Sequence, residues 1–111
     1  MTKIVLEKSG VYGYSKISVS DHSGYAEAGS DIICAYVSSS TELLMSILID
    51  SLGIDAETDI DSEKAFICLK ILDTQKNIGY REIISAVTAG FEKQMKDFSE
   101  QFPKFVSITF A

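Results

Sequence analysis

The chain has 111 residues, of which 46% are hydrophobic, and a net charge of −6. This size and composition predict a single domain, residues 1–111, with a core that needs no disulfide. The acidic balance argues against bare nucleic acid as the main partner, because phosphate contacts need a basic surface. The longest apolar-rich piece, residues 43–52, contains Ser46 and Asp50, and the first residues are too short an apolar segment for a signal peptide. We therefore expect a cytoplasmic protein without a membrane span.

The first half of the chain predicts a hairpin, a loop and a helix. Residues 3–8 and 11–20 have strand-like patterns across a short turn with glycine, which is typical of a β-hairpin. Residues 23–29 are small and polar apart from Tyr25, which predicts a loop. Ser30 is a candidate N-cap, with Asp31 in the first turn of a helix that runs to about Leu52, and Gly53 is a candidate C-cap.

The second half predicts two strands, a helix and a last strand. Acidic residues alternate through residues 54–61, as in an exposed edge strand, and residues 65–72 place Ile67, Leu69 and Ile71 on one face of a strand. A helix is expected over about 78–101, ended by Pro103, and a closing strand over 105–110. The order ββαββαβ favours an α+β fold, with both helices on one face of a mainly antiparallel sheet.

The opposite face of this sheet is expected to carry several apolar side chains. They are Val5, Phe66, Cys68 and Phe105. In so small a protein such a face meets either water or another copy of the chain, so the pattern predicts a homodimer.

Two residues in the first half offer catalytic chemistry. His22 is the only histidine, and Cys34, one of two cysteines, follows twelve positions later at the predicted helix start. A helix N-terminus lowers a thiol pKa, and an imidazole close to sulfur can take the thiol proton. The alternative is a buried structural cysteine with an ordinary surface histidine. We assign no chemistry to Cys68.

Neighbouring residues leave alternatives open. Asp31 could orient His22 or simply satisfy the first helical turn, and Ser38 could hydrogen-bond near the Cys34 sulfur or back to its own helix. One histidine and two scattered cysteines are fewer ligands than a structural zinc site uses, so we predict no metal and no cofactor.

The stretch around these residues resembles the bacterial ribosomal-processing cysteine protease (Prp) family. That family has the pattern Gly-His-Ala, a short loop with glycine, and then Gly-x-Asp-Ile-Val-Cys-Ala-Ala-Val-Ser. Here Asp21-His22-Ser23 is followed, after the loop, by Gly29-Ser30-Asp31-Ile32-Ile33-Cys34-Ala35-Tyr36-Val37-Ser38. The second half of the motif and the spacing from histidine to cysteine agree. Asp21 and Ser23 depart from the glycine and alanine that flank the family's histidine, at positions that bear on rate and substrate fit.

The resemblance implies a homodimeric cysteine endopeptidase that removes an N-terminal extension from the large-subunit ribosomal protein L-twenty-seven. His22 would be the general base, Cys34 the nucleophile, and Asp31 and Ser38 supporting residues. The expected partner is a ribosomal protein with a basic tail, which an acidic surface would attract. The family's mobile loop between histidine and cysteine corresponds to Ser23, Gly24, Tyr25, Ala26, Glu27, Ala28, Gly29 and Ser30.

Two other classes remain open from the sequence. One is a non-catalytic, ribosome-associated binding module with the same fold, and the other is a dimer with an inert core cysteine. Thiol reactivity discriminates between them, because a catalytic Cys34 should alkylate faster than Cys68 in a manner that depends on His22.

Overall fold

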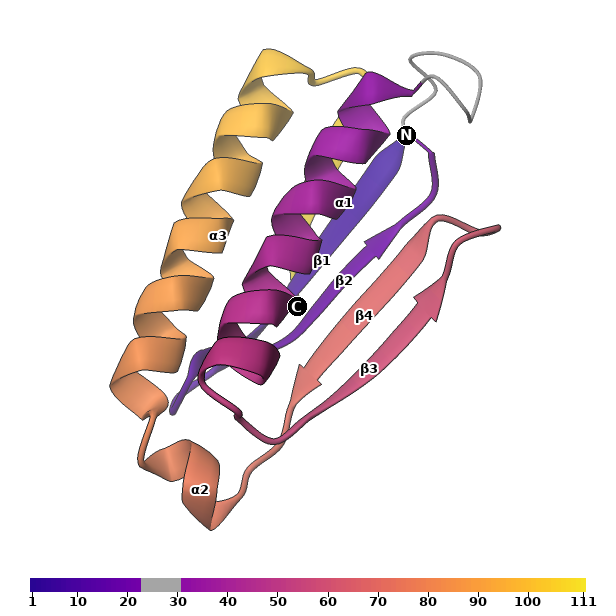
Figure 1. Cartoon of the computed structure of the whole chain (residues 1–111). Coiled ribbons are helices and arrows are strands. Elements are labelled where there is room, and N and C mark those ends of the chain that lie inside the picture. The colour runs from indigo at the N-terminus through magenta and orange to yellow at the C-terminus, as the bar shows by residue number, and fades with distance from the viewer. Residues whose placement is uncertain (23–30) are drawn as a thin grey trace.

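The computed structural model describes residues 1–22 and 31–111 and contains a five-stranded sheet (Figure 1). The strand order is β3-β4-β2-β1-β5. β1 and β5 are parallel, and the other neighbouring pairs are antiparallel. The predicted mainly antiparallel sheet is thus confirmed. The strands are β1 (Thr2–Ser9), β2 (Gly13–Ser20), β3 (Ala56–Asp61), β4 (Phe66–Ile71) and β5 (Val106–Phe110).

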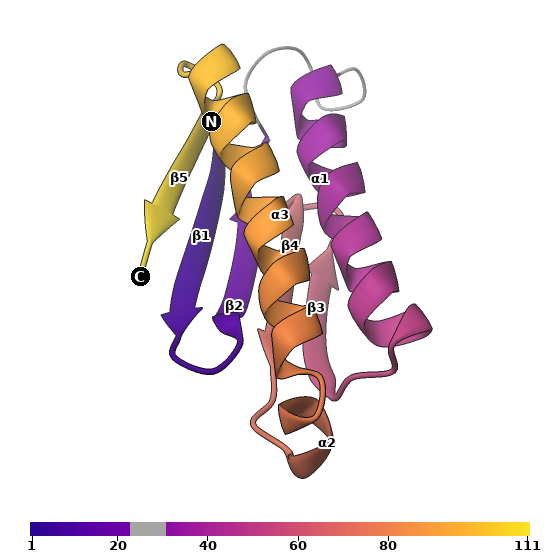
Figure 2. The same ribbon diagram turned by 90° about the vertical axis from the view of Figure 1, so that its left-hand side faces the viewer.

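Two long helices cover the same face of this sheet (Figures 1 and 2). α1 (Ile32–Met45) continues as a π-helical segment, η2 (Ser46–Ser51), and α3 (Arg81–Gln101) follows β4 through the short helix α2 (Gln75–Ile78). The predicted α+β architecture and the order ββαββαβ are confirmed, with α2 as an addition. The helix predicted over about 78–101 begins later, at Arg81, because Gly79 and Tyr80 separate it from α2.

The start of α1 differs from the prediction. The N-cap is Asp31 and not Ser30, since the Asp31 side chain accepts a hydrogen bond from the backbone N–H of Cys34. An aspartate at this position satisfies one of the N–H groups that have no partner within the helix. Cys34 therefore lies in the first turn of α1, close to the positive end of the helix dipole.

The hairpin also begins later than the pattern suggested. β2 starts at Gly13 and not at residue 11, and Gly13 has a φ of +79°. A Cβ atom at this position would lie 3.0 Å from Oγ1 of Thr88. Glycine is required here both for the left-handed backbone and for the close approach of α3.

The hydrophobic core lies between the sheet and the two long helices. Alternating strand residues such as Ile4, Ile17 and Leu69 meet Leu48 and Ile84 from the helical layer, and all are buried. The helix over residues 32–51 has a mean hydropathy of 1.7, so by length and composition alone it could cross a membrane. Core helices pass the same test, and the buried side of this helix belongs to the core of the domain.

The opposite sheet face carries fewer apolar side chains than expected. Val5, Phe66 and Cys68 are half-buried there, as their alternation with buried neighbours predicted. Phe105 instead packs against the core, because it precedes β5 and lies at the turn that follows α3.

Candidate active site

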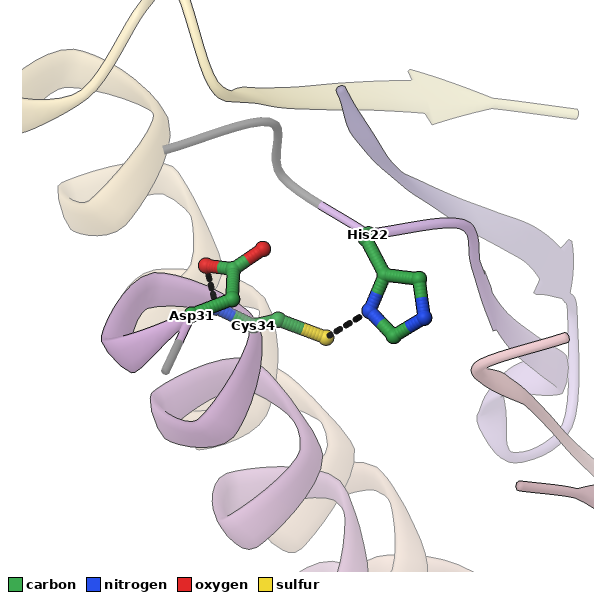
Figure 3. A group of neighbouring side chains, drawn as sticks. All are labelled: His22, Asp31 and Cys34. Carbon is green, nitrogen blue, oxygen red and sulfur yellow. Dashed lines mark hydrogen bonds between the residues drawn. The ribbon is translucent and has the colours of Figure 1, made fainter. Parts of the chain in front are cut away.

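The first turn of α1 positions the Cys34 thiol. The side chain is 8% exposed, and its backbone N–H donates to Oδ1 of Asp31 at 3.0 Å (Figure 3). Asp31 itself is buried. The capping bond thus fixes the backbone of the cysteine and places a carboxylate beside it.

His22 comes from the end of β2 and faces the thiol. Its Nδ1 atom lies 3.7 Å from Sγ of Cys34, and the two side chains point toward one another in Figure 3. This contact between two separate elements makes proton transfer between sulfur and imidazole possible. The sequence prediction of a His–Cys pair is therefore supported by the geometry.

The residue before His22 explains one departure from the family pattern. Asp21 has a φ of +70°, in the left-handed region where glycine is favoured and aspartate is tolerated better than most residues. Its carboxylate lies 3.5 Å from the Lys3 ammonium, on an exposed surface. The glycine of the family pattern thus matches a backbone requirement, and Asp21 meets that requirement at the cost of some strain.

The electrostatic setting of Cys34 contradicts the expected direction of its pKa. Burial raises the pKa of the Cys34 thiol, a hydrogen bond from Ser38 lowers it, the Asp31 charge raises it, and a hydrogen bond from Thr2 lowers it. The sum is a raised pKa, so the prediction of a lowered value was wrong. Desolvation of the thiolate by burial is the largest cause. The thiol is therefore neutral at rest, and its activation requires a base.

A groove of about 220 Å³ opens beside the pair. It lies between α1 and the β3–β4 end of the sheet. His22, Cys34 and Ser38 line it, together with Glu42, Ile60, Asp61, Ser62, Ala65, Phe66 and Ile67. A larger groove of about 400 Å³ runs between α1 and α3, and among the described residues no titratable side chain lines it. The groove at the start of α1 is the one that contains both the thiol and the imidazole.

The same residues are the candidates for metal ligands. One ligand atom each from His22, Asp31 and Cys34 lies within 4.8 Å of the others. Within residues 1–22 and 31–111 this is the one group of three or more such side chains. Thiol, imidazole and carboxylate are donors that zinc accepts, but Asp31 already serves as the helix cap.

The structure thus brings together most of the predicted site. His22, Cys34 and Asp31 converge, and Ser38 lines the same groove one turn further along α1. The predicted substrate loop, Ser23 to Ser30, lies outside the described residues. Sequence reasoning missed Thr2, whose position beside the thiol follows only from the pairing of the strands.

A thiol and an imidazole in contact at a helix N-terminus are the arrangement of an enzyme with a cysteine nucleophile. The family model of the cysteine protease Prp matches residues 1–107. The chain therefore belongs to the cysteine protease Prp family, and it is a cysteine protease with a His–Cys pair.

Solved structures share the fold. The ribosomal processing protease Prp from Staphylococcus aureus, in complex with a covalently linked product peptide, has a TM-score of 0.83 and 13% identity, with 100% of both chains covered. The same protease with a substrate peptide has a TM-score of 0.81 and 12% identity, again with full coverage of both chains. A Streptococcus mutans protein has a TM-score of 0.74 and 21% identity over 98% of this chain and 90% of its own. No curated protein sequence matches the chain.

Proposed function

We propose that this chain is a ribosomal-processing endopeptidase that removes the N-terminal extension of the large-subunit ribosomal protein L-twenty-seven. The contact of 3.7 Å between Nδ1 of His22 and Sγ of Cys34 carries the proposal. It is supported by membership of the Prp family and by the S. aureus structures, which are described as complexes of a ribosomal processing protease with peptides.

The proposed reaction is acyl transfer through Cys34. His22 takes the thiol proton as the sulfur attacks the peptide carbonyl carbon, and the carbonyl π electrons move to oxygen. The tetrahedral intermediate collapses, the C–N bond breaks, and the imidazolium returns the proton to the leaving amine. Water, deprotonated by His22, then hydrolyses the thioester and releases the thiol. The raised pKa of Cys34 makes the histidine necessary, because little thiolate exists without it.

Asp31 has two opposed effects in this scheme. Its carboxylate lies within 4.8 Å of the imidazole and stabilises the imidazolium that forms, while the same charge raises the pKa of the Cys34 thiol. The Cys34 N–H donates to Asp31, so this amide can stabilise an oxyanion only after exchanging partners. The α1 dipole favours the oxyanion in any case.

The groove suits a basic peptide. The groove at the active site shares Glu42 and Ile60 with a second groove of about 390 Å³, which continues along α1 and β3. Asp61 lines the first and Asp50 the second, and no lysine or arginine is among the described lining residues of either. Three carboxylates along one path would attract a Lys- and Arg-rich tail.

The same proposal includes self-association and a cytoplasmic location. The half-buried Val5, Phe66 and Cys68 on the outer sheet face support a homodimer. Both cysteines are free, as is usual in a reducing compartment. Light scattering at micromolar concentration tests the dimer, and a mass that stays at one chain would contradict it.

The decisive experiment is cleavage of a peptide that spans the extended N-terminus of the host's L-twenty-seven protein. Wild type and Cys34→Ala are compared, with mass spectrometry to locate the scissile bond. We expect cleavage by wild type alone, with an unchanged circular dichroism spectrum for the variant. Cleavage by both proteins, or binding of the peptide without cleavage by wild type, would contradict the proposal, and the latter would identify a binding module.

The acidic path is tested with a matched pair of double variants. Glu42→Gln with Asp50→Asn removes two charges from the grooves, and Glu82→Gln with Glu100→Gln removes two exposed charges from α3. The groove variant should lower kcat/KM roughly three- to tenfold at low salt, and added salt should slow the wild type. Equal losses in both variants, or kinetics that do not depend on salt, would overturn the role of the grooves.

A further inference from the structure

Thr2 lies against the active site although it belongs to the first strand. It is 0% exposed, and its hydroxyl donates to the carbonyl of Asp21 at 3.2 Å. Asp21 immediately precedes His22, and its φ of +70° turns the chain out of β2. The hydroxyl thus holds the residue that sets the direction of the histidine.

The backbone of Thr2 is itself fixed by the sheet. Its N–H donates to the carbonyl of Phe105 at 2.8 Å, and it pairs with Val106 in the parallel β1–β5 register. A fully buried side chain on a backbone held in this way has little freedom to move. The Thr2 hydroxyl oxygen therefore has a fixed position at the end of the sheet.

The same hydroxyl also interacts with Cys34. A hydrogen bond between Thr2 and Cys34 favours the thiolate and lowers the thiol pKa, against the larger effect of burial. A threonine hydroxyl has one proton and two lone pairs. While it donates to Asp21 it can accept from the neutral thiol, and when the thiolate forms the proton can turn toward sulfur. The Thr2 hydroxyl can therefore form a hydrogen bond with Cys34 both as a neutral thiol and as a thiolate.

We propose that Thr2 is a positioning residue of the protease: its hydroxyl joins the Asp21 carbonyl to the Cys34 thiol and so sets the approach of His22 to sulfur. This inference rests on the proposed role of Cys34 as nucleophile. It adds a residue from β1 to a site otherwise built from the end of β2 and the start of α1.

The test is Thr2→Val, which keeps the shape and the β-branching of the side chain and removes the hydroxyl. Thr2→Ser keeps the hydroxyl. Thr41→Val is the matched control, because Thr41 is also 0% exposed and its hydroxyl bonds only to the carbonyl of Val37, 2.7 Å away within its own helix, among the bonds of the described residues. Untagged proteins are alkylated with iodoacetamide between pH 6 and 10, with Cys34 and Cys68 followed separately by mass spectrometry.

In Thr2→Val, the midpoint of Cys34 alkylation should rise by about half a pH unit, and kcat/KM for peptide should fall roughly fivefold. Cys68 should not change, and Thr2→Ser and Thr41→Val should behave as wild type. An unchanged Cys34 profile in Thr2→Val, or the same shift in Thr41→Val, would overturn the proposal. Alkylation needs no substrate, so this readout holds even where the peptide of the proposed function is not cleaved.

Discussion

The two ends of the helical layer, at the start of α1 and at α2, lie at opposite ends of the molecule (Figure 1), and they use polar side chains in different ways. At the start of α1, His22 and Cys34 meet over 3.7 Å, and burial disfavours the thiolate. At the other end, Asn77 in α2 is 0% exposed, accepts from the Asp55 N–H at 2.8 Å, and donates to the Asp55 and Leu72 carbonyls at 2.7 Å. Asn77 thus joins three backbone groups by short hydrogen bonds, whereas His22 and Cys34 form a titratable pair that is available for proton transfer.

The largest expected effect concerns the pair of His22 and Cys34. His22→Gln should lower kcat/KM for the peptide by about 10²–10⁴-fold, because the neutral Cys34 thiol loses its base. The free energy of unfolding, measured by thermal denaturation, should change by less than ~0.5 kcal/mol, since His22 is only half-buried and no short hydrogen bond is lost. Wild-type kinetics of this variant, or a large loss of its stability, would contradict the view that this end serves catalysis and the Asn77 end serves stability.

At the other end the effect should fall on stability. Asn77→Ala leaves the Asp55 N–H without its partner, while the Asp55 and Leu72 carbonyls keep the bonds from the N–H groups of Leu72 and Thr74. The free energy of unfolding should therefore fall by about 1–3 kcal/mol. Gln75→Ala, at an exposed position of the same helix, is the matched control. Urea unfolding followed by circular dichroism measures both. Equal stability of the two variants would show that the Asn77 bonds do not hold this end together.

A smaller effect separates the two roles of Asp31. Asn is an equally good N-cap, so Asp31→Asn removes the charge and keeps the helix start. Loss of the charge lowers the Cys34 pKa, so alkylation at a fixed pH below that pKa should become faster. Peptide cleavage should become slower, by about tenfold, because the imidazolium loses its counter-charge. If alkylation and peptide cleavage changed in the same direction, the assignment of two opposed effects to the Asp31 charge would be wrong.

The smallest effect is expected at Asp21. Asp21→Gly relieves the strain of the left-handed backbone conformation but raises the conformational entropy of the unfolded chain. Because these effects oppose each other, the free energy of unfolding should change by less than ~0.5 kcal/mol. Asp21→Ala has no such relief and should cost about 1 kcal/mol. Thermal unfolding of both variants measures the difference. Greater stability of the alanine variant than of the glycine variant would show that φ at this residue is not the constraint.

The local sequence pattern predicted most of the secondary-structure elements. Alternation through β1, β2 and β4 and helical spacing through α1 and α3 predicted the elements, because each buries one face against the same core. The parallel pairing of β1 with β5 and the break between α2 and α3 were not predicted. Both depend on partners that are distant in the chain, such as Asn77 reaching back to Asp55.

The sequence by itself determined the identity of the site: one histidine, a cysteine twelve residues later, and an aspartate at the helix start. These are local features, and the motif that carries them is continuous. Only the tertiary structure decided the state of the thiol. Packing of α1 against the sheet desolvates Cys34 and raises its pKa, although its place in the helix predicted the opposite. The antiparallel pairing of β1 with β2 likewise decided that Thr2 lies at the site, because it brings Thr2 next to Asp21, a residue distant in the chain.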